Sequence, residues 1–237
     1  MPTMKQTLTG LAALASLTLA APAWADAITL DSNSIGDSFT VNFDGFSGGT
    51  TIDGLTSSAT FTLTGITSTG YVFDYSVSNT TSGGLDSRVS SFAFDVDPDI
   101  VDASSTGAFS YSVLSSNYPN GIGTVDVCFK GGDSNSCAGN SGGVLTGDTG
   151  TGSLTLGFDA APESITLSDF FARYQSISGA GNITSASGSG TISSSSSSSG
   201  GTPVPEPGTI GILGLGLAGL AFARRRPRRG KAHLATA

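Results

Sequence analysis

The 237-residue chain is poor in the residue types on which many enzyme active sites depend. Its single histidine is His233, which an apolar segment separates from the bulk of the chain. Upstream of that segment, no Ser-His or Cys-His catalytic pair and no histidine-ligated zinc site can therefore form. The single tryptophan is Trp24, so the residues that follow it lack the side chain most often used as a platform for sugars.

Positive charge is also nearly absent from the main part of the chain. All 18 acidic residues lie between residues 26 and 206 together with only three basic ones, which gives this region a net charge of −15. The three basic residues are Arg88, Lys130 and Arg173. Such an acidic region repels nucleic acid and anionic lipid, so we expect neither as a partner.

The first 25 residues have the pattern of a secretory signal peptide. Lys5 precedes an apolar run over residues 8–21, and Ala23 and Ala25 form a small-x-small cleavage site before Asp26. We therefore expect export and cleavage, with Asp26 as the mature N-terminus. An uncleaved membrane anchor is the alternative, but the apolar run is too short to favour it.

The pattern of residues 26–181 predicts a single domain built from strands. No window in this region has a helical stripe, and apolar residues instead alternate with polar ones, as in half-buried strands. The alternating runs cover residues 39–43, 61–63, 71–77, 92–96, 109–113, 125–129, 154–158 and 168–177. Gly, Ser, Thr, Asn and Asp clusters separate them. Eight to ten short strands predict an all-β domain whose antiparallel sheets pack as a β-sandwich or jelly roll.

Cys128 and Cys137 are the only two cysteines, and they bracket a turn-prone segment with the sequence FKGGDSNS. In an exported chain, which meets an oxidising compartment, this spacing predicts a disulfide that closes a short loop. A metal site would need further Cys or His ligands nearby, and a redox pair would need the closer C-x-x-C spacing.

Composition changes again over residues 182–202, which consist mostly of Ser, Gly and Thr and include seven consecutive serines at 193–199. A tract of this kind has no large apolar side chain to bury. It predicts a flexible linker that follows the domain of residues 26–181, which we call the outer domain.

Residues 203–229 combine a proline-glutamate motif, an uncharged apolar segment over residues 208–223 and a cluster of arginines. The motif residues are Val204, Pro205, Glu206 and Pro207, and the stop-transfer residues are Arg224, Arg225 and Arg226. As a helix, the apolar segment spans roughly 24 Å at about 1.5 Å per residue. This is short for a bilayer core, but arginine side chains can snorkel to the headgroups. The sequence thus predicts one transmembrane helix, with the tail at 230–237 in the cytoplasm.

The motif, the single apolar helix and the arginine cluster together resemble a PEP-CTERM sorting signal. The resemblance implies a bacterial protein that passes through the inner membrane by the secretory pathway and is held there until an exosortase, a membrane-embedded cysteine protease, cuts near the motif. It implies a final location at the cell surface or in the extracellular matrix, and it implies nothing about the activity of the outer domain. The cysteine loop and the run RYQSI also resemble a PEP-CTERM subgroup called cistern.

One acidic cluster stands out in the outer domain, formed by Asp95, Asp97 and Asp99 in the sequence FDVDPD. A D-x-D-x-D pattern opens an EF-hand calcium loop, but the expected Gly and Glu are replaced by Ile100 and Thr106. Two interpretations stay open, a calcium site and a solvated strand end before a turn.

No residue in the sequence is singled out as catalytic. We therefore expect a non-enzymatic protein of the cell surface or extracellular matrix, with no cofactor unless calcium binds. A carbohydrate-binding or adhesion module that recognises an extracellular polysaccharide, with or without calcium, is one alternative, and Tyr118 beside Pro119 is its only aromatic hint. A hydrolase that uses a pair of carboxylates is the other.

Overall fold

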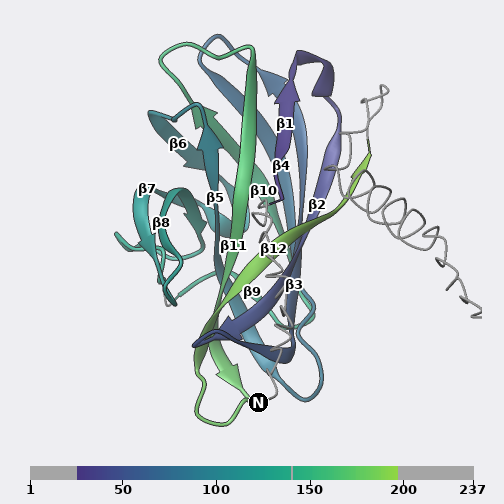
Figure 1. Cartoon of the computed structure of the whole chain (residues 1–237), viewed down its shortest axis with the longest axis vertical. Coiled ribbons are helices and arrows are strands. Elements are labelled where there is room, and N and C mark those ends of the chain that lie inside the picture. Colours follow the sequence, from purple (N-terminus) through teal and green to yellow (C-terminus); the bar gives the residue numbers. More distant parts are fainter. Residues whose placement is uncertain (1–25, 140, 197–237) are drawn as a thin grey trace, which may run out of the picture. The chain divides into compact units, whose positions relative to one another are not determined.

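The computed structural model describes residues 26–139 and 141–196, and these form an antiparallel all-β domain, as predicted (Figure 1). Apart from two three-residue 3₁₀ turns, η1 (Ser32–Ser34) and η2 (Gly107–Phe109), every regular element in this part of the chain is a strand. The strands are β1 (Ile28–Asp31), β2 (Ser38–Ser47), β3 (Thr50–Ile66), β4 (Gly70–Asn79), β5 (Asp86–Asp97), β6 (Asp102–Ser105), β7 (Tyr111–Tyr118), β8 (Gly123–Lys130), β9 (Val144–Leu145), β10 (Thr149–Gly157), β11 (Ser164–Ser178) and β12 (Ser185–Ser196).

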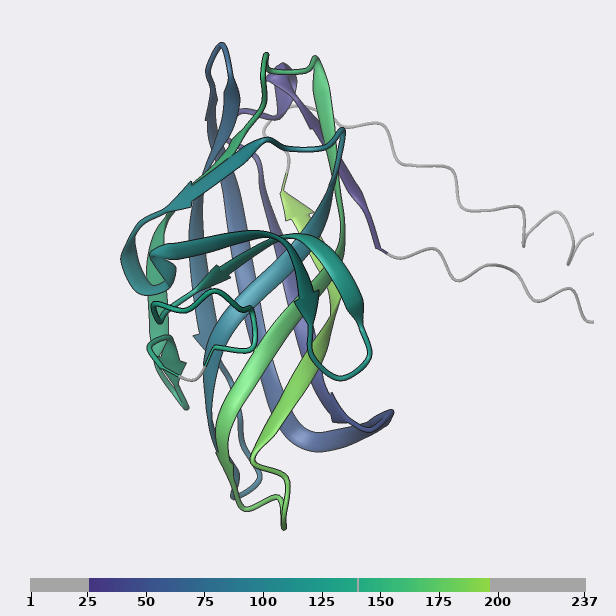
Figure 2. The same ribbon diagram turned by 90° about the vertical axis from the view of Figure 1, so that its left-hand side faces the viewer.

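All twelve strands belong to one sheet rather than to the two packed sheets of a sandwich or jelly roll. The strand order is β6-β10-β4-β3-β2-β12-β11-β5-β8-β7, with β1 added to β11 and β9 added to β5. The two strands at the ends of this order, β6 and β7, lie next to each other. The Ser112 hydroxyl of β7 donates to the Ala103 carbonyl of β6 at 2.6 Å. The sheet therefore curls into a nearly closed barrel (Figure 2).

Bulges explain why a single sheet can curve this far. The register shifts three times between β11 and β5, and once in each of the β12–β2, β2–β3 and β3–β4 pairs. Each extra residue bends its strand and increases the local twist. Long strands that bend in this way wrap around one core, whereas short flat strands would have to stack as separate layers.

The core consists mainly of aromatic side chains from the alternating runs. The Phe61 ring of β3 lies 5.2 Å from Phe39, 5.5 Å from Phe92 and 6.1 Å from Phe94, measured between centroids. All four side chains are at most 2% exposed. Period-two alternation thus identified the interior residues of most runs. It was wrong for two of them: Tyr111 is exposed, and in β11 Phe170, Ala172 and Tyr174 line the core instead of Phe171, Arg173 and Gln175.

The prediction of a flexible linker over residues 182–202 is wrong for residues 185–196. These residues form β12, which lies in the middle of the sheet between β2 and β11. A Cβ atom at Gly188 would lie only 2.9 Å from the Tyr174 ring, and one at Gly190 would lie 2.7 Å from Val41. Small residues are needed here because the neighbouring strands supply the large side chains, so the domain extends to Ser196 rather than to 181.

Several other sequence predictions differ from the structure or lie beyond its described part. Phe109, which was expected in a strand, belongs to η2, and the short strands β1, β6 and β9 were not expected. The predicted signal peptide, transmembrane helix and cytoplasmic tail lie outside the described residues. Within residues 26–139 and 141–196, no helix is long and apolar enough to cross a membrane.

Candidate functional site

The predicted disulfide is present between Cys128, near the end of β8, and Cys137, and the two Cα atoms are 6.0 Å apart. We call residues 128–137 the disulfide loop. Both cysteines are fully buried, and they pack with Ala93, Tyr118 and Val125 in a small apolar cluster separate from the main core. The bond thus fixes the loop against the domain.

Lys130 organises the inside of this loop. Its Nζ donates to the Gly132 carbonyl at 3.1 Å, to the Ser134 carbonyl and to the Ser134 hydroxyl at 3.2 Å. The ammonium also lies 5.6 Å from the centre of the Tyr111 ring. Burial lowers the pKa of Lys130, while the nearby Asp133 raises it. The buried positive charge is therefore satisfied by oxygen atoms of the loop.

Lys130 belongs to a row of four residues that lie side by side on neighbouring strands. Lys130 of β8 pairs with Ser91 of β5, Ser91 pairs with Arg173 of β11, and Arg173 pairs with Ser187 of β12. We call these four residues the basic row. Because side chains alternate along a strand, the row lies on the opposite face of the sheet from the neighbouring core residues Phe92 and Phe129.

Two chain segments cover the basic row from outside. The Ser91 hydroxyl donates to the Cys137 carbonyl at 3.0 Å, and the Gln175 side chain donates to the Ala138 carbonyl at 2.5 Å, which ties the disulfide loop to β5 and β11. The Ser187 hydroxyl donates to the Pro119 carbonyl at 3.2 Å, which ties the β7–β8 turn to β12. The four residues of the row are consequently buried.

Tyr118 is part of this cover and is not an exposed sugar platform. Its side chain is fully buried, its ring lies 5.9 Å from Phe171, and its hydroxyl lies 3.3 Å from the Ser91 hydroxyl. Burial raises the pKa of Tyr118. The one aromatic hint of carbohydrate binding in the sequence therefore has a packing role.

Arg173 differs from Lys130 because two of its three guanidinium nitrogens have no hydrogen-bond acceptor. Only 7% of the residue is exposed, and its Nε and Nη1 atoms are buried without a hydrogen-bond partner. Burial lowers the pKa of the Arg173 guanidinium, and the neighbouring Tyr118 raises it. Sequence analysis did not select this residue, although it is one of only three basic residues in the acidic region.

The predicted calcium ligands are not brought together. Asp95 accepts a hydrogen bond from the Asp126 amide at 3.0 Å, and Asp126 accepts one from the Val96 amide at 2.9 Å, so these carboxylates link β5 to β8. Asp97 and Asp99 are exposed at the end of β5. Among the residues that the structure describes, no three His, Cys, Asp or Glu side chains are grouped so that they could hold a metal ion.

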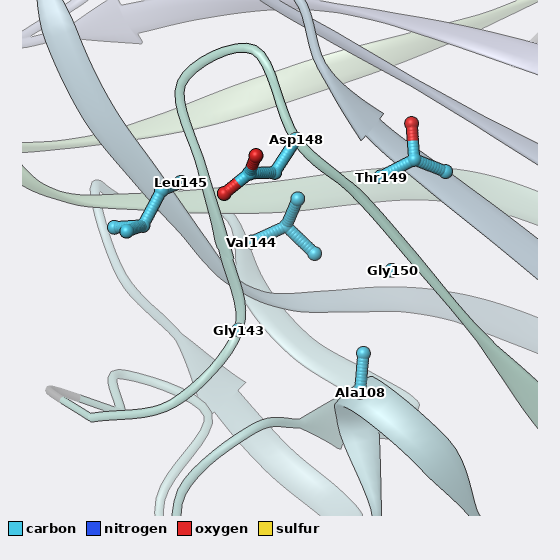
Figure 3. A pocket seen from close by; sticks show the side chains of 7 residues that line it. All are labelled: Ala108, Gly143, Val144, Leu145, Asp148, Thr149 and Gly150. Atoms are coloured by element: carbon cyan, nitrogen blue, oxygen red, sulfur yellow. The ribbon is translucent and has the colours of Figure 1, made fainter.

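A shallow hollow of about 370 Å³ lies beside β9 and the start of β10 (Figure 3). It is lined by Ala108, Gly143, Val144, Leu145, Asp148, Thr149 and Gly150. Its lining has one carboxylate, that of Asp148, whereas glycoside hydrolysis usually requires two. The hollow therefore does not supply the carboxylate pair of the hydrolase alternative.

The described residues thus define an all-β domain in which the disulfide loop covers the buried basic row. Beyond this domain, the family model of the PEP-CTERM protein-sorting motif matches residues 203–227. The chain therefore carries a PEP-CTERM protein-sorting motif near its C-terminus, whereas its assignment to the cistern subgroup stays a prediction. The motif implies export, exosortase as the processing enzyme and sorting to the cell surface or extracellular space. No curated protein and no solved structure matches the chain.

Proposed function

We propose that this chain is a non-enzymatic protein of the cell surface or extracellular matrix, delivered there by exosortase processing at the inner membrane. The match of the sorting motif to residues 203–227 carries the proposal. It is supported by the domain that precedes the motif, in which a tightly packed aromatic core and a short disulfide loop suit an extracellular environment.

Mass spectrometry of the mature protein from its native host tests the delivery. We expect an N-terminus at Asp26 and a C-terminus near Pro205, because the signal peptide and the segment after the motif are removed. In a strain that lacks exosortase, the same protein should keep its apolar segment and arginines. A wild-type protein that still ends at Ala237 would contradict processing.

An activity screen tests the non-enzymatic role separately from the delivery. The purified mature protein should leave a panel of polysaccharides and peptides unchanged, while a biofilm matrix from a strain without the protein should differ in cohesion. Turnover that disappears when Asp148 is replaced by Asn would contradict the proposal, because that carboxylate lines the one hollow described above.

A further inference from the structure

The second half of β12 is held in the sheet by a strand on one side only. β12 pairs with β11 through residues 185–189, whereas its pairing with β2 continues to Ser196. In Figure 1 the end of β12 accordingly lies apart from β11. We call residues 190–196 the terminal half of β12. In the described part of the chain, one edge of this half has no strand partner, and a strand paired at one edge opens more easily than one paired at both.

Strand β1 takes the place beside β11 that β12 leaves. Residues 28–31 of β1 pair with residues 164–167 of β11, next to the stretch 171–175 that pairs with β12. We call residues 26–31 the N-terminal strap. The strap therefore lies where β12 and β11 separate.

Asp26 connects the strap to the terminal half of β12. Its carboxylate accepts a hydrogen bond from the Ile192 amide at 2.7 Å, and in the part of the chain that the structure describes it is the one group outside β2 that bonds to this half. Ile192 carries the only large apolar side chain of the terminal half, and it packs against the main core. The register between β12 and β2 shifts between Ile192 and Ser194. Asp26 thus secures β12 where its pairing with β2 is irregular.

We propose that the N-terminal strap is a latch that controls how far the sorting motif can lie from the folded domain. The proposal rests on the function proposed above, in which exosortase cuts near the motif. With the latch closed, the six residues 197–202 separate β12 from the matched motif, and they span at most about 20 Å.

Opening of the latch lengthens this connection. When residues 190–196 leave the sheet, these seven residues join the six that follow, and the thirteen together span up to about 45 Å. A membrane-embedded protease reaches a motif on the longer connection more easily, because the folded domain no longer has to stay as close to the cleavage site.

Hydrogen–deuterium exchange of the full chain, purified in detergent from a strain without exosortase, tests the latch by itself. Asp26→Ala should speed amide exchange about tenfold throughout residues 190–196, and not only at Ile192, because a hydrogen bond to a charged acceptor is lost. Asp26→Asn keeps an oxygen acceptor and should speed exchange less. Asp53→Ala removes an exposed aspartate from β3 and, as the matched control, should leave this exchange unchanged. Equal exchange in Asp26→Ala and the wild type would overturn the proposal.

Pulse–chase labelling in the native host tests the consequence for sorting. Asp26→Ala should lose its C-terminal segment several-fold faster than the wild type and Asp53→Ala, because more chains present the motif on the longer connection. Mass analysis of the N-terminus checks that each variant still begins at residue 26. Processing at an unchanged rate despite faster exchange would overturn the control of the motif by the strap. A C-terminal segment that persists in every protein, the wild type included, would instead contradict exosortase processing itself.

Discussion

At the scale of single residues, a glycine explains how a strand without large side chains can stay buried. A Cβ atom at Gly188 would lie 2.9 Å from the Tyr174 ring and 3.1 Å from the Phe43 Cβ. We expect Gly188→Val to lower the free energy of unfolding by about 1–3 kcal/mol, as overpacking of a core does. Gly65→Val is the matched control, because no atom lies within 4 Å of a Cβ built at Gly65. Urea denaturation should show a much smaller change for the control, and equal losses would contradict the packing argument.

Asp95 makes the stability of the domain depend on pH. Burial is the main cause that raises the pKa of Asp95 from 3.8, the Asp126 amide lowers it, and the carboxylates of Asp126 and Asp169 raise it further. A raised pKa in the folded state means that the protonated carboxyl favours folding. This contribution is complete below the unfolded pKa and is lost as the pH rises through the folded pKa.

Asp95→Asn should therefore gain stability relative to the wild type as the pH rises above about 4. The amide oxygen can still accept the hydrogen bond from the Asp126 amide, so the fold should be kept. Denaturant unfolding of both proteins between about pH 3 and pH 7 measures the difference. A difference that does not change with pH would show that Asp95 titrates normally.

At the scale of elements, the disulfide loop is a local staple and not the basis of the fold. Cys128 and Cys137 pack in a cluster separate from the main core. A Cys128→Ala, Cys137→Ala double variant should lose about 2.5–3 kcal/mol of unfolding free energy, because the bond closes a loop of about ten residues. Circular dichroism should show that the sheet remains. Complete unfolding of the double variant would mean that the loop is essential to the fold.

Strand β12 is the element on which closure of the sheet depends. It pairs with β11 on one side and with β2 on the other. A fragment of residues 26–196 should therefore fold, whereas a fragment of residues 26–181 should leave two strand edges unpaired and be degraded rapidly by protease. Limited proteolysis with mass spectrometry compares them. If protease degraded the two fragments at the same rate, residues 182–196 would be a linker and not a strand that the fold requires.

Sequence predicted the elements that bury their own apolar side chains and missed those that do not. Phe61 and Phe92 stand in alternating runs, so their strands and their inward direction follow from period two. Residues 185–196 have no such signal, because Gly188 and Gly190 are covered by side chains of other strands. The curvature of the single sheet depends on bulges whose positions only the strand pairing reveals.

The candidate site was predictable only in part for the same reason. The disulfide follows from cysteine spacing and compartment, and it is confirmed. Arg173 could be noted as a rare basic residue, but its burial depends on the register that places it between Ser91 and Ser187. Asp95 and Asp97 lie on the same face of β5, but the Asp95 carboxylate is bonded to the Asp126 amide of β8, whereas the strand ends at Asp97 and leaves Asp97 and Asp99 in solvent. Neither the pairing of Asp95 with β8 nor the end of the strand can be read from the D-x-D-x-D pattern.

At the scale of the whole molecule, the position of β12 sets the order of events during export. On the proposed route the chain crosses the inner membrane from its N-terminus, so β1 to β11 would emerge while the place between β2 and β11 is still empty. Only six residues, 197–202, separate the end of β12 from the matched sorting motif. On that route, the sheet would close only when the sorting signal reaches the membrane, so that folding of the domain and recognition of the signal would take place at nearly the same time.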